Sequence, residues 1–282
     1  MRWRGQRESN NIEDRRGLTG GRIAAGGGIG AVIIIIISLL SGKDLSGVLS
    51  LFQSGTATEQ AAPGTLQTDA QDSTAHLVAT VLASTEDVWT TIFRENGATY
   101  TKPTLALFTG TTESGCGGAS AAMGPFYCPA DQKVYIDLSF CNELRNRFQA
   151  PGDFAVAYVI AHEVGHHVQN LLGISAKVQR MRSRLSEADY NKLSVKLELQ
   201  ADFLAGVWAY HADNMQQLLE PGDLESALTA ANAIGDDKLQ QEAQGYVVPD
   251  AFTHGTSRQR MYWFKKGFET GDLSQGKFED IQ

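Results

Sequence analysis

The strongest apolar pattern in the chain lies in residues 153–172, where apolar side chains occupy most positions ahead of a group of three histidines. Such a stretch is typical of a helix with largely apolar surroundings. We therefore predict a helix over 153–172 whose lead-in is buried and holds the histidine-bearing turn inside the protein. The residues that make this lead-in apolar are Phe154, Ala155, Tyr158, Val159, Ile160 and Ala161.

Apolar residues also recur at intervals of three and four from Ser73 onward, which predicts an amphipathic helix. Asp72 or Ser73 is suited to cap its start, and Gly97 is suited to end it. Ser186 is suited to cap a second, longer helix over residues 187–212. Much of the carboxy-terminal third is also expected to be helical.

Two short segments are predicted as strands. Residues 104–108 form a continuous apolar run, and residues 133–138 alternate between apolar and polar side chains. The second strand could be an exposed sheet edge that binds an extended peptide, or an ordinary structural strand. The expected fold is therefore α+β, mainly α-helical, with a small sheet beside the helix at 153–172.

Residues 23–42 are twenty uncharged residues with five successive isoleucines at 33–37. At a rise of 1.5 Å per residue this length matches a hydrocarbon core of about 30 Å, so we predict one transmembrane helix. A buried core segment and a cleaved signal peptide are the alternatives. The signal peptide fits less well, because the basic region ahead is long and no small-residue cleavage site follows promptly.

These features divide the chain into a basic cytoplasmic tail at 1–22, the transmembrane helix at 23–42, a flexible linker at 43–72 and a folded domain at 73–282. The linker assignment rests on its small, polar, aperiodic residues. Basic residues ahead of a membrane span tend to stay in the cytoplasm. We therefore predict a single-pass membrane protein whose domain is extracytoplasmic, in the periplasm or at the cell surface.

The charge balance also differs between the two parts of the chain. Residues 1–43 have a net charge of +4, whereas the whole chain has −8, so the remainder carries −12. An acidic domain of this kind disfavours a nucleic-acid partner.

Three cysteines are consistent with an oxidising compartment. Cys116 and Cys128 stand twelve apart in a glycine-rich stretch and could close a small disulfide loop, which would leave Cys141 free. A metal site built from cysteines is the alternative, although their spacing fits no familiar zinc pattern.

The histidine-bearing turn reads His162-Glu163-Val164-Gly165-His166 and fits the pattern H-E-x-x-H. Residues four apart share a helix face, so His162 and His166 can reach one Zn²⁺ from a single element. Glu163 lies one step round the helix, where it can take a proton from zinc-bound water. A helix that carries histidines by coincidence remains the alternative until a third ligand is found.

Glu198 is the candidate third ligand. It lies four residues before Asp202, so the two carboxylates share one helix face within an otherwise apolar stretch. Carboxylates are rarely buried unpaired. Glu198 could bind the metal while Asp202 accepts a hydrogen bond from the far nitrogen of a ligand histidine.

These motifs resemble the bacterial neutral zinc metallopeptidase family. The resemblance rests on MRWRGQRESNNIEDRRG, GPFYCPADQKVYIDLSF, AHEVGHHVQN, LELQADFLAGVW and THGTSRQRMYWFKKG, which together span most of the chain. It implies a membrane-anchored peptidase with a zincin-like domain of the gluzincin type and one Zn²⁺ per chain. His162, His166 and Glu198 would be its ligands and Glu163 its catalytic base. Cys141 departs from the family pattern, where we expect an aromatic residue.

His254 is followed six residues later by Arg260, and a similar pair occurs in membrane-stress and prenyl-protein-processing gluzincins. That resemblance implies that His254 stabilises the oxyanion. It also implies that Arg260 holds a cleft carboxylate or the substrate backbone. A capping histidine and a surface arginine are the alternative interpretation.

The sequence therefore predicts an endopeptidase that acts on a polypeptide substrate through metal-activated water, with Glu163 as general base. The first alternative is a catalytically idle, zinc-bearing scaffold or partner-binding membrane protein. The second is a closed structural zinc site, which would need His167 as a fourth ligand. His167 lies about 100° round the helix from His166, so we expect it to pack rather than bind metal.

Overall fold

The computed structural model describes residues 1–17 and 72–282. The predicted transmembrane helix at 23–42 and all but the last residue of the predicted linker at 43–72 lie outside the described residues. Among the residues that are described, no helix combines the length and the apolar character needed to cross a bilayer.

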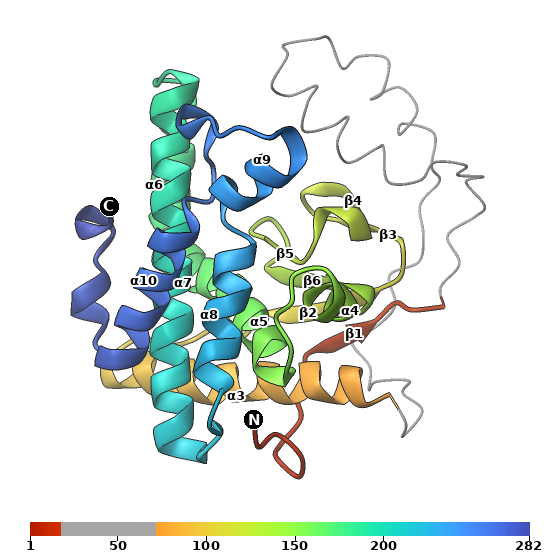
Figure 1. The fold of residues 1–282 in the computed structure, drawn as a ribbon. Helices are drawn as coiled ribbons and strands as arrows, with labels where there is room; N and C mark the ends of the chain where they lie inside the picture. The colour runs from red at the N-terminus through yellow and green to blue at the C-terminus, as the bar shows by residue number, and fades with distance from the viewer. Residues whose placement is uncertain (18–71) are drawn as a thin grey trace.

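The described residues form an α+β fold that is mainly helical (Figure 1). The α-helices are α3 (Ser73–Glu95), α4 (Ser139–Asn146), α5 (Asp153–Leu171), α6 (Ile174–Gln179), α7 (Glu187–Gln216), α8 (Asp223–Ala233), α9 (Asp236–Gln244) and α10 (Ser257–Thr270). Short 3₁₀ turns are η1 (Ala121–Met123), η2 (Pro249–Ala251), η3 (Leu273–Gly276) and η4 (Phe278–Asp280). The strands are β1 (Ile12–Asp14), β2 (Thr104–Phe108), β3 (Thr111–Ser114), β4 (Gly117–Ser120), β5 (Phe126–Cys128) and β6 (Lys133–Asp137).

The helix caps follow the sequence signals. Asp72 accepts a hydrogen bond from the backbone N–H of Ala75 at the start of α3, and Ser186 does the same for Asp189 at the start of α7. Each bond satisfies a backbone donor that the first helical turn leaves free.

Four strands form one sheet in the order β1-β2-β6-β5, while β3 and β4 form a separate hairpin. The first three strands are parallel, and β5 runs antiparallel to β6. The strand expected at 133–138 is therefore internal, because β2 and β5 pair with its two sides. The edge strand nearest the histidine-bearing helix is β5, which the sequence pattern did not single out.

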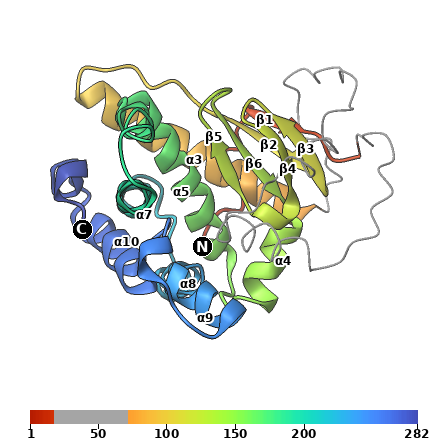
Figure 2. The ribbon, with the colours of Figure 1, turned by 90° about the horizontal axis from the view of Figure 1, so that it is seen from above.

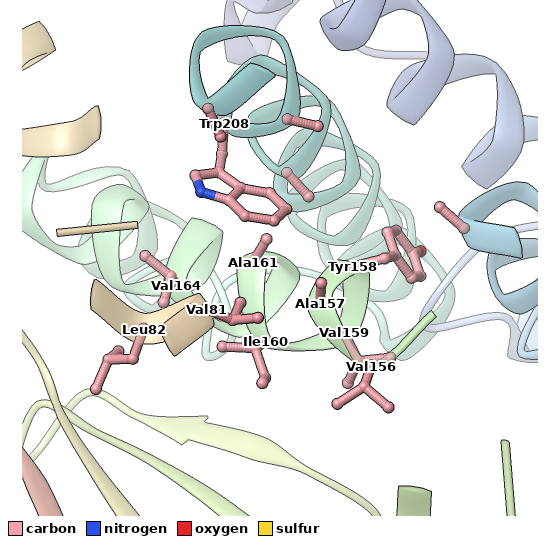
Figure 3. Packing of buried hydrophobic residues seen from close by; sticks show 14 of the residues in the cluster. Val81, Leu82, Val156, Ala157, Tyr158, Val159, Ile160, Ala161, Val164 and Trp208 are labelled. Atoms are coloured by element: carbon pink, nitrogen blue, oxygen red, sulfur yellow. The ribbon is translucent and has the colours of Figure 1, made fainter. Parts of the chain in front are cut away.

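Helix α5 lies between this sheet and the layer of helices that contains α7, α8 and α10 (Figure 2). Its apolar lead-in is buried on all sides, as the sequence predicts. Figure 3 shows Val156, Ile160 and Val164 of α5 among buried side chains that include Val81 and Trp208. This packing fixes the histidine-bearing turn relative to both layers.

The amino-terminal residues correct the predicted domain boundaries. Residues 1–22 were expected to form a separate tail, but residues 1–17 pack into the domain. Strand β1 pairs in parallel with β2, with Ile12 opposite Leu105, and Ile12 is only 1% exposed (Figure 1). Three arginines of this segment, Arg7, Arg15 and Arg16, are paired with acids, and Arg7 contacts the buried Glu86 of α3 at 3.1 Å. Hydrogen bonding and ion pairing thus bring into the fold a segment whose composition suggested a solvated tail.

Two of the cysteines form a disulfide. Cys116, in the turn of the β3–β4 hairpin, is bonded to Cys128 in the edge strand β5, the pairing expected from the sequence. Cys141 is free and buried. The disulfide fastens the hairpin to β5.

Candidate metal centre

Three side chains from two helices converge in the interior. His162 and His166 come from α5, and Glu198 comes from α7. Nε2 of His162 lies 3.2 Å from Oε2 of Glu198, and Nε2 of His166 lies 3.4 Å from Oε1. One ligand atom from each residue can be chosen so that all three lie within 4.8 Å of one another. Zinc bonds of about 2.0–2.1 Å at tetrahedral angles place ligand atoms roughly 3.3 Å apart, so this donor set fits a Zn²⁺ ion.

Gly165 brings the two helices close enough for this convergence. A Cβ atom at position 165 would lie 2.9 Å from the carbonyl oxygen of Ala201 on α7. Any larger residue would push α7 away from α5. The glycine between the two histidines therefore sets the depth at which Glu198 meets them.

Asp202 contacts the ring nitrogen of His162 that faces away from Glu198. Its Oδ1 lies 2.8 Å from Nδ1 of His162 and accepts a hydrogen bond from the hydroxyl of Tyr158. A carboxylate accepts only, so Nδ1 carries a proton and Nε2, which faces Glu198, is the nitrogen left to bind a metal. The structure thus places Asp202 where the sequence predicted it.

Arg260 holds a carboxylate, which is one of the two roles that the sequence suggests for it. Its side chain is 3% exposed and paired with Asp202 through Nε at 2.9 Å and Nη2 at 3.1 Å. It also donates to the carbonyl oxygen of Ile234. The carboxylate it holds lies behind His162, so Arg260 does not face a substrate.

The electrostatics of the cluster suit a cation. Burial opposes the ionised form of Glu198, but His166 and His254 outweigh it, and the pKa of Glu198 lies well below its ordinary value. Burial alone would lower the pKa of His162, but Asp202 and Glu198 raise it to about 10. The acidic groups thus hold protons on the imidazoles, and a dication would take the place of those protons.

Glu163 points into the same buried region. It is 8% exposed, and burial raises its pKa, an effect that His162 and His166 partly offset. A carboxylate with a raised pKa is better able to accept and return a proton near neutral pH.

His254 is held by Asp236, which the sequence analysis missed. One oxygen of Asp236 accepts hydrogen bonds from the backbone N–H groups of Thr253, His254 and Gly255, and the other lies 3.1 Å from Nδ1 of His254. Burial lowers the pKa of His254, but Glu198 and Asp236 outweigh it, and the net shift is upward. The ring is half exposed and near enough to Glu198 for each to shift the pKa of the other. No sequence motif links Asp236 to His254 across eighteen residues.

His167 lies outside the metal cluster, as expected. Its Nε2 is 2.6 Å from the carbonyl oxygen of Thr101, so this nitrogen donates, and its Nδ1 accepts from the hydroxyl of Tyr127 at 2.9 Å. Asn170 donates to the same hydroxyl. Tyr127 belongs to the edge strand β5, so His167 fastens that strand to the helix that bears the histidines.

A family model described as "Putative neutral zinc metallopeptidase" matches residues 1–278 of the chain. The chain belongs to the neutral zinc metallopeptidase family. The match includes the amino-terminal segment as well as the helices that carry His162, His166 and Glu198.

Relatives in bacteria match the chain over its whole length or over part of it. The chain is 49% identical over 284 residues to "Uncharacterized protein YpfJ" of Escherichia coli strain K12, covering 98% of this chain and 97% of that protein. It is 45% identical over 183 residues to "Uncharacterized protein Mb2605" of Mycobacterium bovis, covering 61% of each chain. No solved structure matches this member of the family.

Proposed function

We propose that this protein is a zinc-dependent endopeptidase that hydrolyses peptide bonds with Glu163 as general base. The observation that carries the proposal is the convergence of His162, His166 and Glu198 on one point. Among the described residues, this cluster offers three ligands, the number that a catalytic zinc uses while it keeps one position for water. His167 is engaged elsewhere with Thr101 and Tyr127, which argues against a closed structural site.

Zn²⁺ bound to these ligands would act as a Lewis acid that polarises the scissile carbonyl and lowers the pKa of bound water towards 7. Glu163 accepts the proton of the attacking water and then delivers it to the leaving amine. His254, held by Asp236, donates a hydrogen bond to the oxygen on which negative charge develops. Asp202 and Arg260 hold His162 in the tautomer whose Nε2 faces the cluster.

The polypeptide substrate is proposed to lie along β5. An extended peptide can add to an open sheet edge through backbone hydrogen bonds. Support comes from the position of β5 at the end of the sheet and from its attachment to α5 through Tyr127 and His167. The Cys116–Cys128 disulfide holds the other side of the strand.

We also propose that the domain works in an oxidising compartment and that residues 23–42 associate with a membrane. The disulfide supports the first part, because such bonds are rare in reducing compartments. The twenty uncharged residues at 23–42 support the second.

The competing function is a zinc-bearing scaffold without catalysis. A scaffold would need the ligands but not a buried carboxylate beside them, so the presence of Glu163 favours the enzyme. The test is Glu163→Gln in the full chain, with unfolded casein as the substrate. Turnover should be abolished while zinc content stays near one per chain. Glu143→Gln, at an exposed position on α4, is the matched control. Undiminished turnover by Glu163→Gln would overturn the mechanism.

A further inference from the structure

A chain of amide hydrogen bonds runs from His166 to the carboxy-terminal segment. Nδ1 of His166 lies 2.9 Å from Oε1 of Gln169. The amide nitrogen of Gln169 donates to the carbonyl oxygen of Leu197 at 2.7 Å and to Oε1 of Gln200 at 3.0 Å. The amide nitrogen of Gln200 donates in turn to the carbonyl oxygen of Gly276 at 2.9 Å. Gln169 and Gln200 are 0% and 4% exposed.

The donor-to-acceptor direction of these hydrogen bonds is fixed by the backbone carbonyls that accept them. The backbone carbonyls of Gly276 and Leu197 can only accept, so Gln200 and Gln169 must turn their NH₂ groups towards them. Each glutamine then presents its oxygen in the opposite direction. The oxygen of Gln169 therefore faces His166 and requires a proton on Nδ1. That requirement leaves Nε2 of His166, the atom 3.4 Å from Glu198, as the nitrogen available to a metal.

We propose that Gln169 and Gln200 are positioning residues that hold His166 in its metal-binding tautomer. The inference rests on the zinc site proposed above and deepens it. The two ligand histidines are thus oriented by different chemistry, His162 by the charged pair of Asp202 and Arg260 and His166 by neutral amides. Because the amides carry no charge, they fix the tautomer without adding to the negative charge around the cluster.

The test measures the zinc affinity of the full chain by competition with a chromogenic chelator, starting from metal-free protein. Gln169→Met and Gln200→Met keep the side-chain volume but remove the hydrogen bonds. Loss of an outer contact of this kind weakens metal binding by about 10–100-fold, and we expect a rise in Kd of that size for Gln169→Met. Gln179→Met, at an exposed position on α6, should bind zinc like the wild type.

A double-mutant cycle separates positioning from general destabilisation. If Gln200 acts through Gln169, adding Gln200→Met to Gln169→Met should not weaken zinc binding further. The melting temperature of each metal-free variant reports its folding separately from metal binding. If wild type binds one zinc and Gln169→Met binds it with the same Kd, the positioning role of Gln169 is overturned while the zinc site stands. A wild type that binds no zinc overturns the metal site itself.

A second inference follows from the amino-terminal segment. Strand β1 is hydrogen-bonded to β2, Arg16 pairs with Asp72, and Ser9 and Asn11 donate to the buried Glu86. These contacts require residues 1–17 and residues 72–282 to be in the same compartment. A single membrane crossing between them would separate the two parts and remove β1 from its sheet.

We infer that residues 1–17 share the oxidising compartment of the domain, on the same side of any membrane that residues 23–42 enter. The prediction of a cytoplasmic amino-terminal tail does not fit this arrangement. Arg7, Arg15 and Arg16 have acidic partners within the fold, as the pairs of Arg7 with Glu86 and of Arg15 with Glu13 show. In the folded protein they are structural residues rather than a cytoplasmic retention signal.

The test is cysteine labelling of the full chain in bacterial cells with a membrane-impermeant maleimide. Gln6→Cys reports on the amino-terminal segment and Tyr262→Cys on the domain, since both positions are exposed. The native cysteines should give little background, because two are bonded and burial raises the pKa of Cys141 to about 11.

Labelling of both positions in intact cells is the expected result. Labelling of Tyr262→Cys alone, with Gln6→Cys reacting only after permeabilisation, would show a single crossing and overturn the inference. Protection of both positions in intact cells would overturn the assignment to an oxidising compartment. Wild-type protein, treated in parallel, measures the background from the native cysteines.

Discussion

Oε2 of Glu198 lies 3.2 Å from Nε2 of His162, although 36 residues separate the two along the chain. The contact depends on the close approach of α5 and α7 at Gly165 and Ala201. The geometry of the candidate metal site is therefore a property of helix packing. A change that separates the two helices should weaken zinc binding even when every ligand is intact.

Replacement of the third ligand tests this geometry directly. Glu198→Ala leaves His162 and His166 in place but removes the anionic donor, so zinc Kd should rise by at least about 100-fold, beyond the loss expected for an outer contact. Zinc content after dialysis, measured by atomic emission, reports the change. Glu187→Ala, at an exposed position on the same helix, should keep its zinc. Full zinc occupancy in Glu198→Ala would show that Glu198 is not a ligand.

The candidate ligand set could be predicted from the sequence because its spacing is local. The positions of His162 and His166 follow from one helical turn, and those of Glu198 and Asp202 from another. What made the second pair informative was its apolar setting, which implied buried carboxylates. Gln169 follows the same logic, three residues after His166, but an amide in an apolar helix carries a weaker signal than a carboxylate.

Features that depend on contacts distant in sequence were not predictable. Strand β1 has only three residues, two of them acidic, and only its pairing with β2 makes it a strand. Asp236 meets His254 through loop geometry, and Arg260 is buried because α10 packs against α7. In each case the side chain alone is typical of a solvated surface, and the partner that changes this lies on another element.

Asp236 should control the pH range in which His254 acts. Burial lowers the pKa of His254, but Glu198 and Asp236 outweigh it and raise the pKa, which keeps the ring protonated to higher pH. Activity should therefore fall as pH rises through that pKa. Asp236→Asn removes one of the raising groups, so the fall should begin at lower pH.

Kinetics against unfolded casein across pH 5–9 measure this shift in kcat. His254→Ala should lower kcat by about 10²–10³-fold, the loss typical of an oxyanion donor. Asp250→Asn, at an exposed position nearby in sequence, should keep the wild-type profile. If kcat fell over the same alkaline pH range in wild type and in Asp236→Asn, the positioning role of Asp236 would be contradicted.

Glu13 should make stability depend on pH through the amino-terminal strand. Burial raises its pKa, but its bonds to Arg15 at 2.9 Å and Lys133 at 2.7 Å outweigh this and lower the pKa below the ordinary 4.5. A depressed pKa stabilises the fold above the unfolded value, and this contribution is lost as pH falls through the folded value. Glu13→Gln should cost about 1–3 kcal/mol at pH 7, with a smaller cost at pH 3.5.

Urea unfolding at the two pH values measures the difference between wild type and Glu13→Gln. Glu279→Gln, at an exposed position, should match wild type at both. A difference that stays constant with pH would mean that the charge of Glu13 does not stabilise the amino-terminal strand.

The Cys116–Cys128 disulfide should stabilise the domain and position the edge strand β5. It closes a loop with a sequence separation of 12, for which the chain-entropy model gives roughly 3 kcal/mol. In a domain of this size, that corresponds to a melting temperature lower by roughly 6–12 °C in Cys116→Ser/Cys128→Ser. Because the bond fastens the hairpin to the edge strand β5, its loss should also raise KM for casein more than it lowers kcat. Dithiothreitol should lower the melting temperature of wild type and leave that of the double variant unchanged, which separates loss of the bond from the serine substitutions. If reduction left the wild-type melting temperature and KM unchanged, β5 would hold its position without the disulfide.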